Sequence, residues 1–154
     1  MDRRIVVVGG GRAGTLVANR LHEGAGSGVR IVVVDRVDNR DLETELLVAL
    51  GLHGGGTPRP PDDLRLREGI EFRHVAVSSV DAGRAELCLA DGTTLGYDAL
   101  VLATGRHPLP RGLEGTGQDR AAGVHVLAGT AGAGLDGVAA HVRAAIVADA
   151  VHRR

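Results

Sequence analysis

The sequence predicts an α/β fold in which a parallel sheet with crossover helices carries a small antiparallel insertion. An apolar, β-branched run at residues 5–8 leads directly into a glycine turn and then into a helical pattern. A second run, at residues 29–34, is mostly valine, as in parallel strands that are covered on both faces. Between residues 72 and 95 the apolar period changes to two, which is typical of antiparallel strands.

The length of 154 residues suits one domain. A chain of this size buries roughly 68–70% of its unfolded surface, which is enough for a hydrophobic core. We therefore expect residues 1–154 to form a single domain, with the antiparallel insertion at about 72–95 and a C-terminal helix at about 135–152.

The composition argues against several classes of partner. The formal net charge is −1, so we expect no basic surface for nucleic acid or an anionic membrane. The lone Cys88 excludes an internal disulfide, and the histidines show no metal-ligand spacing, so we expect no metal site. No apolar run approaches the roughly 18 residues of a membrane span, and residues 1–4 lead into a strand without a signal peptide. We therefore expect a cytoplasmic protein without a transmembrane segment.

The glycine turn has the spacing GxGxxG, with glycines at 9, 11 and 14. In this fingerprint Gly9 permits a tight turn, Gly11 lets a phosphate approach the backbone, and Gly14 lets the helix pack closely on the strand. The N-terminus of the following helix offers unpaired N–H groups and a partial positive charge to a pyrophosphate. The turn therefore predicts a dinucleotide site, although 24 glycines in the chain make a simple turn in an unrelated α/β protein the alternative.

An acidic residue supports the dinucleotide interpretation. Asp35 follows Gly14 by 21 residues and ends the second apolar strand. At that place a carboxylate can accept hydrogen bonds from the two hydroxyls of a ribose.

The elements between the glycine turn and the insertion follow from residue patterns. Leu16, Val17 and Leu21 recur at helical spacing and predict the crossover helix, which a turn at 23–28 connects to a strand at 29–35. Acidic residues precede leucines at 41–52, which predicts a short helix. Glycine and proline fill residues 54–63, so we expect a loop there and a helical turn at 64–68.

The insertion is predicted to contain three strands. Apolar residues alternate at 75–80, 84–89 and 93–95, with turn signals at 81–83 and 91–92. The pair Asp91-Gly92 between two such runs is a hairpin signal.

The last part of the chain returns to the α/β pattern. Residues 97–105 form an apolar run that ends in a small-residue turn, and we expect its strand to rejoin the parallel sheet. A loop at 106–117, a short strand at 123–128 and the helix at 135–152 follow. The glycines at 129–134 suit either a second phosphate loop or, as we favour, a simple turn.

Five stretches together resemble the flavin-binding half of the pyridine nucleotide-disulfide oxidoreductase superfamily, and most of all type II NADH dehydrogenases and sulfide:quinone reductases. They are RIVVVGGGRAG, VRIVVVDRVDN, GIEFRHVAVSSVD, LADGTTLGYDALVLATG and RHPLP, within residues 3–110. The resemblance implies an FAD-binding, Rossmann-like domain of an oxidoreductase.

The resemblance also implies roles for individual residues. It places the FAD pyrophosphate at Gly9, Gly11, Arg12, Ala13 and Gly14. It places the adenosine ribose at Asp35, the adenine beneath Arg36 and beside the backbone of Val77, and the flavin diphosphate near the turn Ala103, Thr104 and Gly105.

The sequence departs from the family pattern in two respects. The family's NADH-binding domain and its C-terminal Gly-Asp segment are not among these residues. Where the family brings aromatic and proline residues near the flavin, this chain reads RDLETELLVALGLHGGG.

Three functions are compatible with the sequence. The first is an FAD-dependent oxidoreductase that uses a partner chain or self-association, and the second is a non-catalytic Rossmann-fold module that acts through a protein partner. The third is an NAD(P)-using reductase, in which Asp35 would repel the 2′-phosphate of NADP and Arg36 could accommodate it. No residue is assigned a catalytic role, since His53 and His107 lie in predicted loops.

Overall fold

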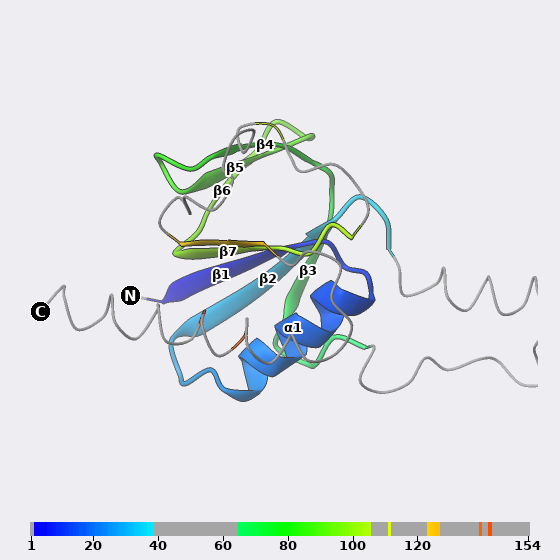
Figure 1. The fold of residues 1–154 in the computed structure, drawn as a ribbon, viewed down its shortest axis with the longest axis vertical. Helices are drawn as coiled ribbons and strands as arrows, with labels where there is room; N and C mark the ends of the chain where they lie inside the picture. The colour runs from blue at the N-terminus through cyan, green and yellow to red at the C-terminus, as the bar shows by residue number, and fades with distance from the viewer. Residues whose placement is uncertain are drawn as a thin grey trace, which may run out of the picture.

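The computed structural model describes residues 2–38, 65–105, 111, 123–126, 139 and 142. Within these residues it contains one complete helix and two sheets (Figure 1). In chain order the elements are β1 (Arg3–Val8), α1 (Arg12–Glu23), β2 (Val29–Asp35), β3 (Glu71–His74), β4 (Val77–Asp81), β5 (Glu86–Leu89), β6 (Thr94–Gly96), β7 (Ala99–Leu102) and β8 (Val124–Val126).

The larger sheet has five parallel strands in the order β3-β2-β1-β7-β8. Val6 of β1 pairs with Val32 of β2 on one side and with Leu100 of β7 on the other. The chain therefore moves outward from β1 in one direction and later resumes on its opposite side. In such sheets ligands bind where the strand order reverses, at the carboxyl ends of the strands. Here that edge lies next to β1 and holds the glycine turn.

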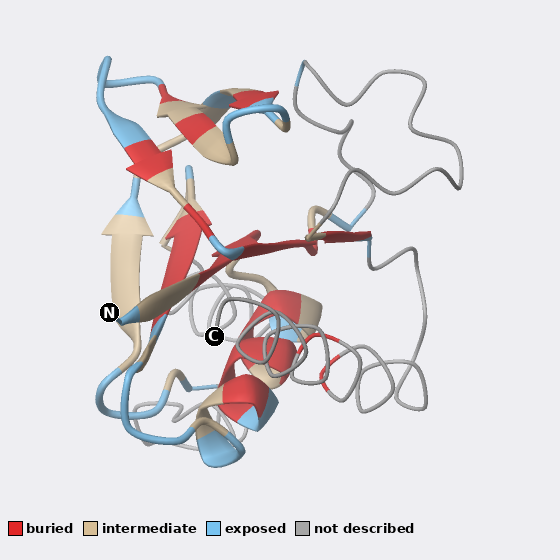
Figure 2. Cartoon of the chain, turned by 90° about the vertical axis from the view of Figure 1, so that its left-hand side faces the viewer, coloured by how far each residue is buried: buried red, intermediate tan, exposed pale blue. Residues whose placement is uncertain are grey.

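Alternating side chains of the parallel strands enter two different hydrophobic clusters. Val7 of β1 faces the side of the sheet that α1 covers, whereas Val6 faces the side that the small sheet covers. Figures 1 and 2 show this layering, with α1 and the small sheet on opposite faces of the buried strands. Burial of each such valine contributes about 1.5–3 kcal/mol, so both faces select apolar residues at the buried positions of β1, β2 and β7.

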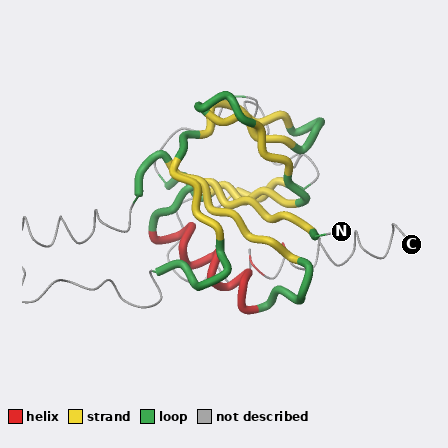
Figure 3. The backbone as a smooth tube through the Cα atoms, turned by 180° about the vertical axis from the view of Figure 1, so that it is seen from behind, coloured by secondary structure: helices red, strands yellow, loops and turns green. Residues whose placement is uncertain are grey.

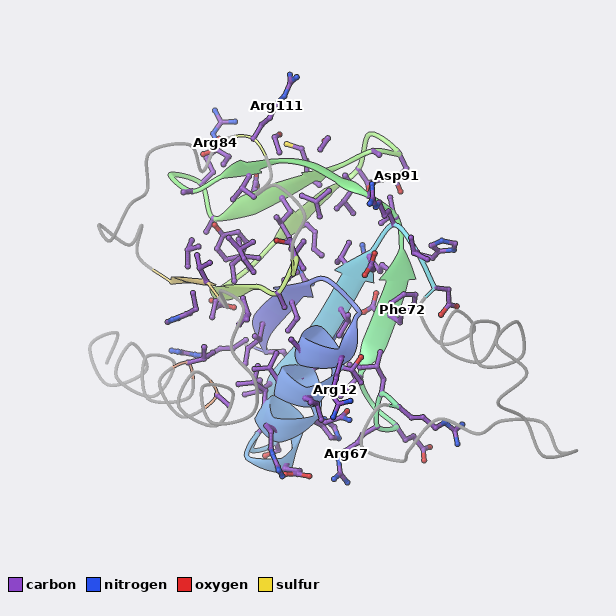
Figure 4. The ribbon with its side chains drawn as sticks, turned by 45° about the vertical axis from the view of Figure 1, so that its right-hand side comes forward. Arg12, Arg67, Phe72, Arg84, Asp91 and Arg111 are labelled. Atoms are coloured by element: carbon purple, nitrogen blue, oxygen red, sulfur yellow. The ribbon has the colours of Figure 1, made fainter. Side chains whose placement is uncertain are left out.

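The smaller sheet is antiparallel, in the order β4-β5-β6. Figure 3 shows it at the top, separated from α1 by the strands of the larger sheet. In the turn that joins β5 to β6, the Asp91 carboxylate accepts the N–H of Thr93 at 2.9 Å and its hydroxyl at 2.7 Å. Gly92 in this turn has a φ of 84°, which favours glycine. The hairpin predicted at Asp91-Gly92 is therefore confirmed (Figure 4).

The predicted start of the insertion at residue 72 is wrong. Phe72 belongs to β3, which pairs in parallel with β2 at the edge of the larger sheet, and the antiparallel strands begin at Val77. An edge strand is partly exposed and therefore alternates like an antiparallel strand. The second strand of the insertion also starts later than predicted, at Glu86, because Ala85 adopts a left-handed φ of 54°.

The helical turn predicted at 64–68 is also wrong, since the described residues 65–70 form a bend and a turn. Asn19 of α1 accounts for this conformation. Its side-chain amide donates to the carbonyl of Arg65 at 2.8 Å and accepts the N–H of Arg67 at 3.0 Å. Both main-chain groups thus bond to α1 rather than to a helical turn of their own.

The remaining expectations divide into confirmed and undescribed segments. The strands predicted at 29–35, 97–105 and 123–128 correspond to β2, β7 and β8. Of the helix predicted at 135–152, only Ala139 and Val142 are described; both are helical and buried. The segments 41–52, 54–63 and 129–134, together with His53, His107 and the loop at 106–117 apart from Arg111, lie outside the described residues.

Candidate dinucleotide-binding site

The glycine turn lies between the carboxyl ends of β2 and β7. The N–H of Gly9 donates to the carbonyl of Val34 at 2.8 Å, and the N–H of Ala103 donates to the carbonyl of Val8 at 2.8 Å. Gly9 has a φ of 107°, and a Cβ on it would overlap the carbonyl oxygen of Ala103. No other residue can therefore make this turn without moving β7.

The other two fingerprint glycines differ in what surrounds them. A Cβ on Gly14 would overlap the carbonyl oxygen of Gly9, so Gly14 allows α1 to pack against the end of β1. Gly11 has a φ of −71°, and no described atom would lie within 4 Å of a Cβ added to it. The described protein atoms thus require glycine at 9 and 14 but leave open space at 11, where a ligand could approach the main chain.

The N-terminus of α1 provides donors for an anion beside this open space. Gly11 is the N-cap, no side chain caps the helix, and the first turn contains no acidic residue. The first helical bond runs from the N–H of Thr15 to the carbonyl of Gly11, which leaves the N–H groups of Arg12, Ala13 and Gly14 without intrahelical acceptors. The guanidinium of Arg12 is exposed here and adds a positive charge (Figure 4). This arrangement can hold a phosphate or pyrophosphate.

Asp35 lies at the end of β2 and its carboxylate is half-buried beside the glycine turn. Its Oδ2 accepts the main-chain N–H of Gly10 at 2.6 Å, and its Oδ1 accepts the N–H of Val37 at 3.0 Å. A carboxylate is an acceptor with about four positions, which is the chemistry that the two hydroxyls of a ribose require. The pair Asp35–Gly10 therefore connects a candidate ribose acceptor directly to the candidate phosphate loop.

Three residues of this region were missed by the sequence analysis: Gly10, Phe72 and His74. A Cβ on Gly10 would lie 3.1 Å from the Phe72 ring, so the aromatic side chain of β3 packs against the turn. His74 pairs in register with Asp35, and its Nε2 lies 3.0 Å from the carbonyl oxygen of Arg36. Recognising residues 71–74 as the parallel neighbour of β2 would have found both contacts.

The predicted ATG turn also lies at this edge of the sheet. Ala103 follows β7, and its Cβ lies 3.5 Å from the position of a Cβ on Gly14. A Cβ on Gly9 would lie 3.3 Å from the main-chain nitrogen of Thr104, and Gly105 follows with a φ of 64°. Val77 is placed in the other sheet, where it opens β4 and pairs with Leu89. The structure thus brings the glycine turn, Asp35 and the ATG turn together.

The strand order and the two covering layers define the chain as a Rossmann-like domain. A family model described as "Pyridine nucleotide-disulphide oxidoreductase" matches residues 3–147, and the chain belongs to this family. The predicted resemblance is therefore confirmed. Ferroptosis suppressor protein 1 of Taeniopygia guttata is 36% identical over 102 residues, which cover 66% of this chain and 26% of that protein.

Solved structures of similar fold agree with this assignment. The ferredoxin reductase for the CYP199A2 system of Rhodopseudomonas palustris matches with a TM-score of 0.51 and 27% identity, over 68% of this chain and 26% of that one. Putidaredoxin reductase, in its covalent complex with putidaredoxin, matches with a TM-score of 0.52 and 28% identity, over 72% and 28% of the two chains. The sulfide:quinone oxidoreductase of Aquifex aeolicus shares the fold, at 23% identity, a TM-score of 0.50 and coverage of 70% and 25%. The chain spans about a quarter of the length of these relatives.

Proposed function

We propose that this chain is the FAD-binding domain of an oxidoreductase. The observation that carries the proposal is the open space over Gly11, at an uncapped helix N-terminus that Asp35 joins to the end of β2 through Gly10. Gly9 and Gly14 are explained by contacts within the protein, whereas glycine at 11, at the helix N-terminus, would be explained by a ligand that approaches its main chain.

The residues at this edge of the sheet would divide the cofactor between them. The pyrophosphate would lie at Gly9, Gly11, Arg12, Ala13 and Gly14, and the flavin diphosphate would also approach Ala103, Thr104 and Gly105. Asp35 would accept hydrogen bonds from the adenosine ribose. Arg36 would lie over the adenine, and the backbone of Val77 would contact it.

Within the family chemistry, the flavin supplies hydride and electron transfer, and the protein supplies position and electrostatics. For this chain the described residues bind and orient the adenosine and pyrophosphate portions. Turnover would require a surface that delivers a hydride to the flavin, which a partner chain, a second copy or a further segment would provide. Binding of FAD without turnover would instead identify a non-catalytic binding module, the alternative function.

Asp35 also bears on the choice between FAD and NADP. Its carboxylate would bind the adenosine ribose and would repel a 2′-phosphate. FAD and NAD carry no such phosphate, so the site favours them over NADP. Arg36 follows directly and would weaken this discrimination if its side chain reached the phosphate.

The test is a cofactor titration of the purified chain. Its absorption spectrum is recorded, and FAD, FMN, NAD and NADP are then titrated while the oligomeric state is followed by light scattering. We expect saturable binding of FAD, weaker binding of FMN because it lacks the adenosine half, and no saturation by NADP. If only NAD bound saturably, NAD rather than FAD would be the ligand of this site. The absence of any saturable binding would refute the proposed site.

A further inference from the structure

We infer that His74 is a positioning residue for the adenosine half of the dinucleotide, and that it acts by holding the turn that presents Asp35 and Arg36. This inference rests on the proposed function, because it concerns the same ligand. It adds a residue from a neighbouring strand, His74, to which the sequence analysis assigns no role.

At least three hydrogen bonds hold the chain where it leaves β2. The N–H of Val75 donates to the carbonyl of Asp35 at 2.9 Å, and the Asp35 carboxylate accepts the N–H of Val37 at 3.0 Å. The third bond joins Nε2 of His74 to the carbonyl of Arg36 at 3.0 Å. A carbonyl oxygen only accepts, so Nε2 carries the proton in this bond.

The bond from His74 differs from the other two in its origin. It comes from a side chain of β3, the edge strand, whose last residue is in register with Asp35. It therefore fixes the peptide between Arg36 and Val37 relative to the sheet. That peptide sets the direction in which the Arg36 side chain leaves the backbone, and it keeps the Val37 N–H aimed at the Asp35 carboxylate.

Exposure of His74 makes the effect separable from folding. The imidazole is exposed at the sheet edge and belongs to neither hydrophobic cluster. If the side chain were removed, water could satisfy the Arg36 carbonyl, so the fold would lose little. The turn would be less ordered before binding, and the ligand would have to order it. The free energy needed to order the turn would lower the affinity of the chain for any ligand that carries adenosine.

The test compares His74→Ala, His74→Gln and His22→Ala with the wild-type chain. Glutamine retains an N–H donor on a side chain of similar reach. His22, near the C-terminal end of α1 and next to Gly69, serves as a matched control because it lies at the opposite end of the helix from the glycine turn. Dissociation constants for FAD and ADP are measured by calorimetry, together with unfolding midpoints and hydrogen exchange of the Val37 amide without ligand.

We expect His74→Ala to weaken the binding of FAD and of ADP by the same factor, roughly two- to tenfold, because the ligand must then order the turn that this one hydrogen bond holds in the wild type. The Val37 amide should exchange faster in this variant, and its unfolding midpoint should match that of the wild type. His74→Gln and His22→Ala should bind like the wild type. Unchanged affinities in His74→Ala, or the same weakening in His74→Gln, would overturn the inference while leaving the proposed function intact. Failure of the wild type to bind either ligand would overturn both.

Discussion

The carboxylate of Asp35 accepts the main-chain N–H of Gly10 at 2.6 Å, and this bond ties the end of β2 to the glycine turn that follows β1. The same side chain accepts the N–H of Val37 beyond the strand. Asp35 thus organises the site before any ligand arrives. The residue that the sequence suggests as a ribose acceptor is also a structural link between two strands.

Replacing Asp35 should therefore affect stability as well as binding. In Asp35→Ala the N–H groups of Gly10 and Val37 lose a charged acceptor, which we expect to lower the free energy of unfolding by about 1–3 kcal/mol. Urea denaturation without ligand measures this loss, and an FAD titration measures the accompanying loss of affinity. The control is Glu68→Ala, an exposed acidic residue in the 65–70 turn. Wild-type stability and affinity in Asp35→Ala would contradict this dual role.

Gly9 and Gly14 should be far less tolerant of a side chain than Gly26. A Cβ on Gly9 would overlap the carbonyl of Ala103, and one on Gly14 would overlap the carbonyl of Gly9, whereas no described atom would come within 4 Å of one on Gly26. Because main-chain atoms must move, Gly9→Ala and Gly14→Ala should each destabilise the fold by about 3 kcal/mol. Thermal unfolding followed by circular dichroism, with Gly26→Ala as the control, measures the difference. Equal unfolding temperatures in all three variants would show that the turn does not have this geometry.

Tyr97 should titrate above its ordinary value in the folded protein. Burial between the two sheets raises the pKa of its hydroxyl above 10.0, and the negative charge of Asp81 raises it further. The chain has one tyrosine and no tryptophan, so tyrosinate absorbance reports this group alone. The midpoint should fall to its ordinary value in urea, and a native midpoint at or below 10.0 would contradict the burial of the hydroxyl.

The same shift predicts how stability depends on pH. Above about pH 10 the unfolded chain releases the tyrosine proton while the folded chain retains it, so stability should fall as pH rises toward the raised pKa. This component should vanish in Tyr97→Phe, which denaturation curves at pH 8 to 11 would reveal. If the free energy of unfolding of Tyr97→Phe fell with pH as steeply as that of the wild type, the pH dependence would come from other titrating groups.

Tyr97→Phe should also leave stability at pH 7 unchanged or increase it. Among the described residues the buried hydroxyl has no hydrogen-bond partner, and burying such a group costs about 1–3 kcal/mol. Phenylalanine keeps the ring that packs in the cluster and removes the polar atom. A free energy of unfolding lower by more than about 1 kcal/mol would indicate that the hydroxyl is satisfied after all.

A strand of this fold can be predicted from the sequence when both of its faces are buried. β1, β2 and β7 are covered on both sides, which demands continuous apolar residues and makes them visible in the sequence. β3 is an edge strand with the alternating sequence Glu71-Phe72-Arg73-His74, so it was assigned to the antiparallel insertion. The turn at 65–70 depends on Asn19, a residue far away in sequence, and no local pattern could predict it.

The candidate site divides in a similar way. The positive φ of Gly9 and the contact of Gly14 with the Gly9 carbonyl arise within one strand-turn-helix unit, so the spacing alone predicts glycine at both positions. The contact of Gly9 with the Ala103 carbonyl comes from the end of β7 and is visible only in the structure. The link from Asp35 to Gly10 and the bond from His74 to Arg36 depend on the register between neighbouring strands. Spacing along a single strand carries no information about that register, which is why these contacts emerged only from the structure.

The most direct measurement for the central claim is the FAD affinity of Gly11→Val beside that of Gly26→Val. At both glycines no described atom lies within 4 Å of an added Cβ, so we expect both variants to fold, which their unfolding midpoints check. At position 11 valine would fill the space through which a phosphate reaches the main chain, whereas Gly26 lies in the turn after α1. By isothermal titration we expect no detectable FAD binding for Gly11→Val and wild-type binding for Gly26→Val. Wild-type affinity in Gly11→Val would contradict the placement of the cofactor at the glycine turn.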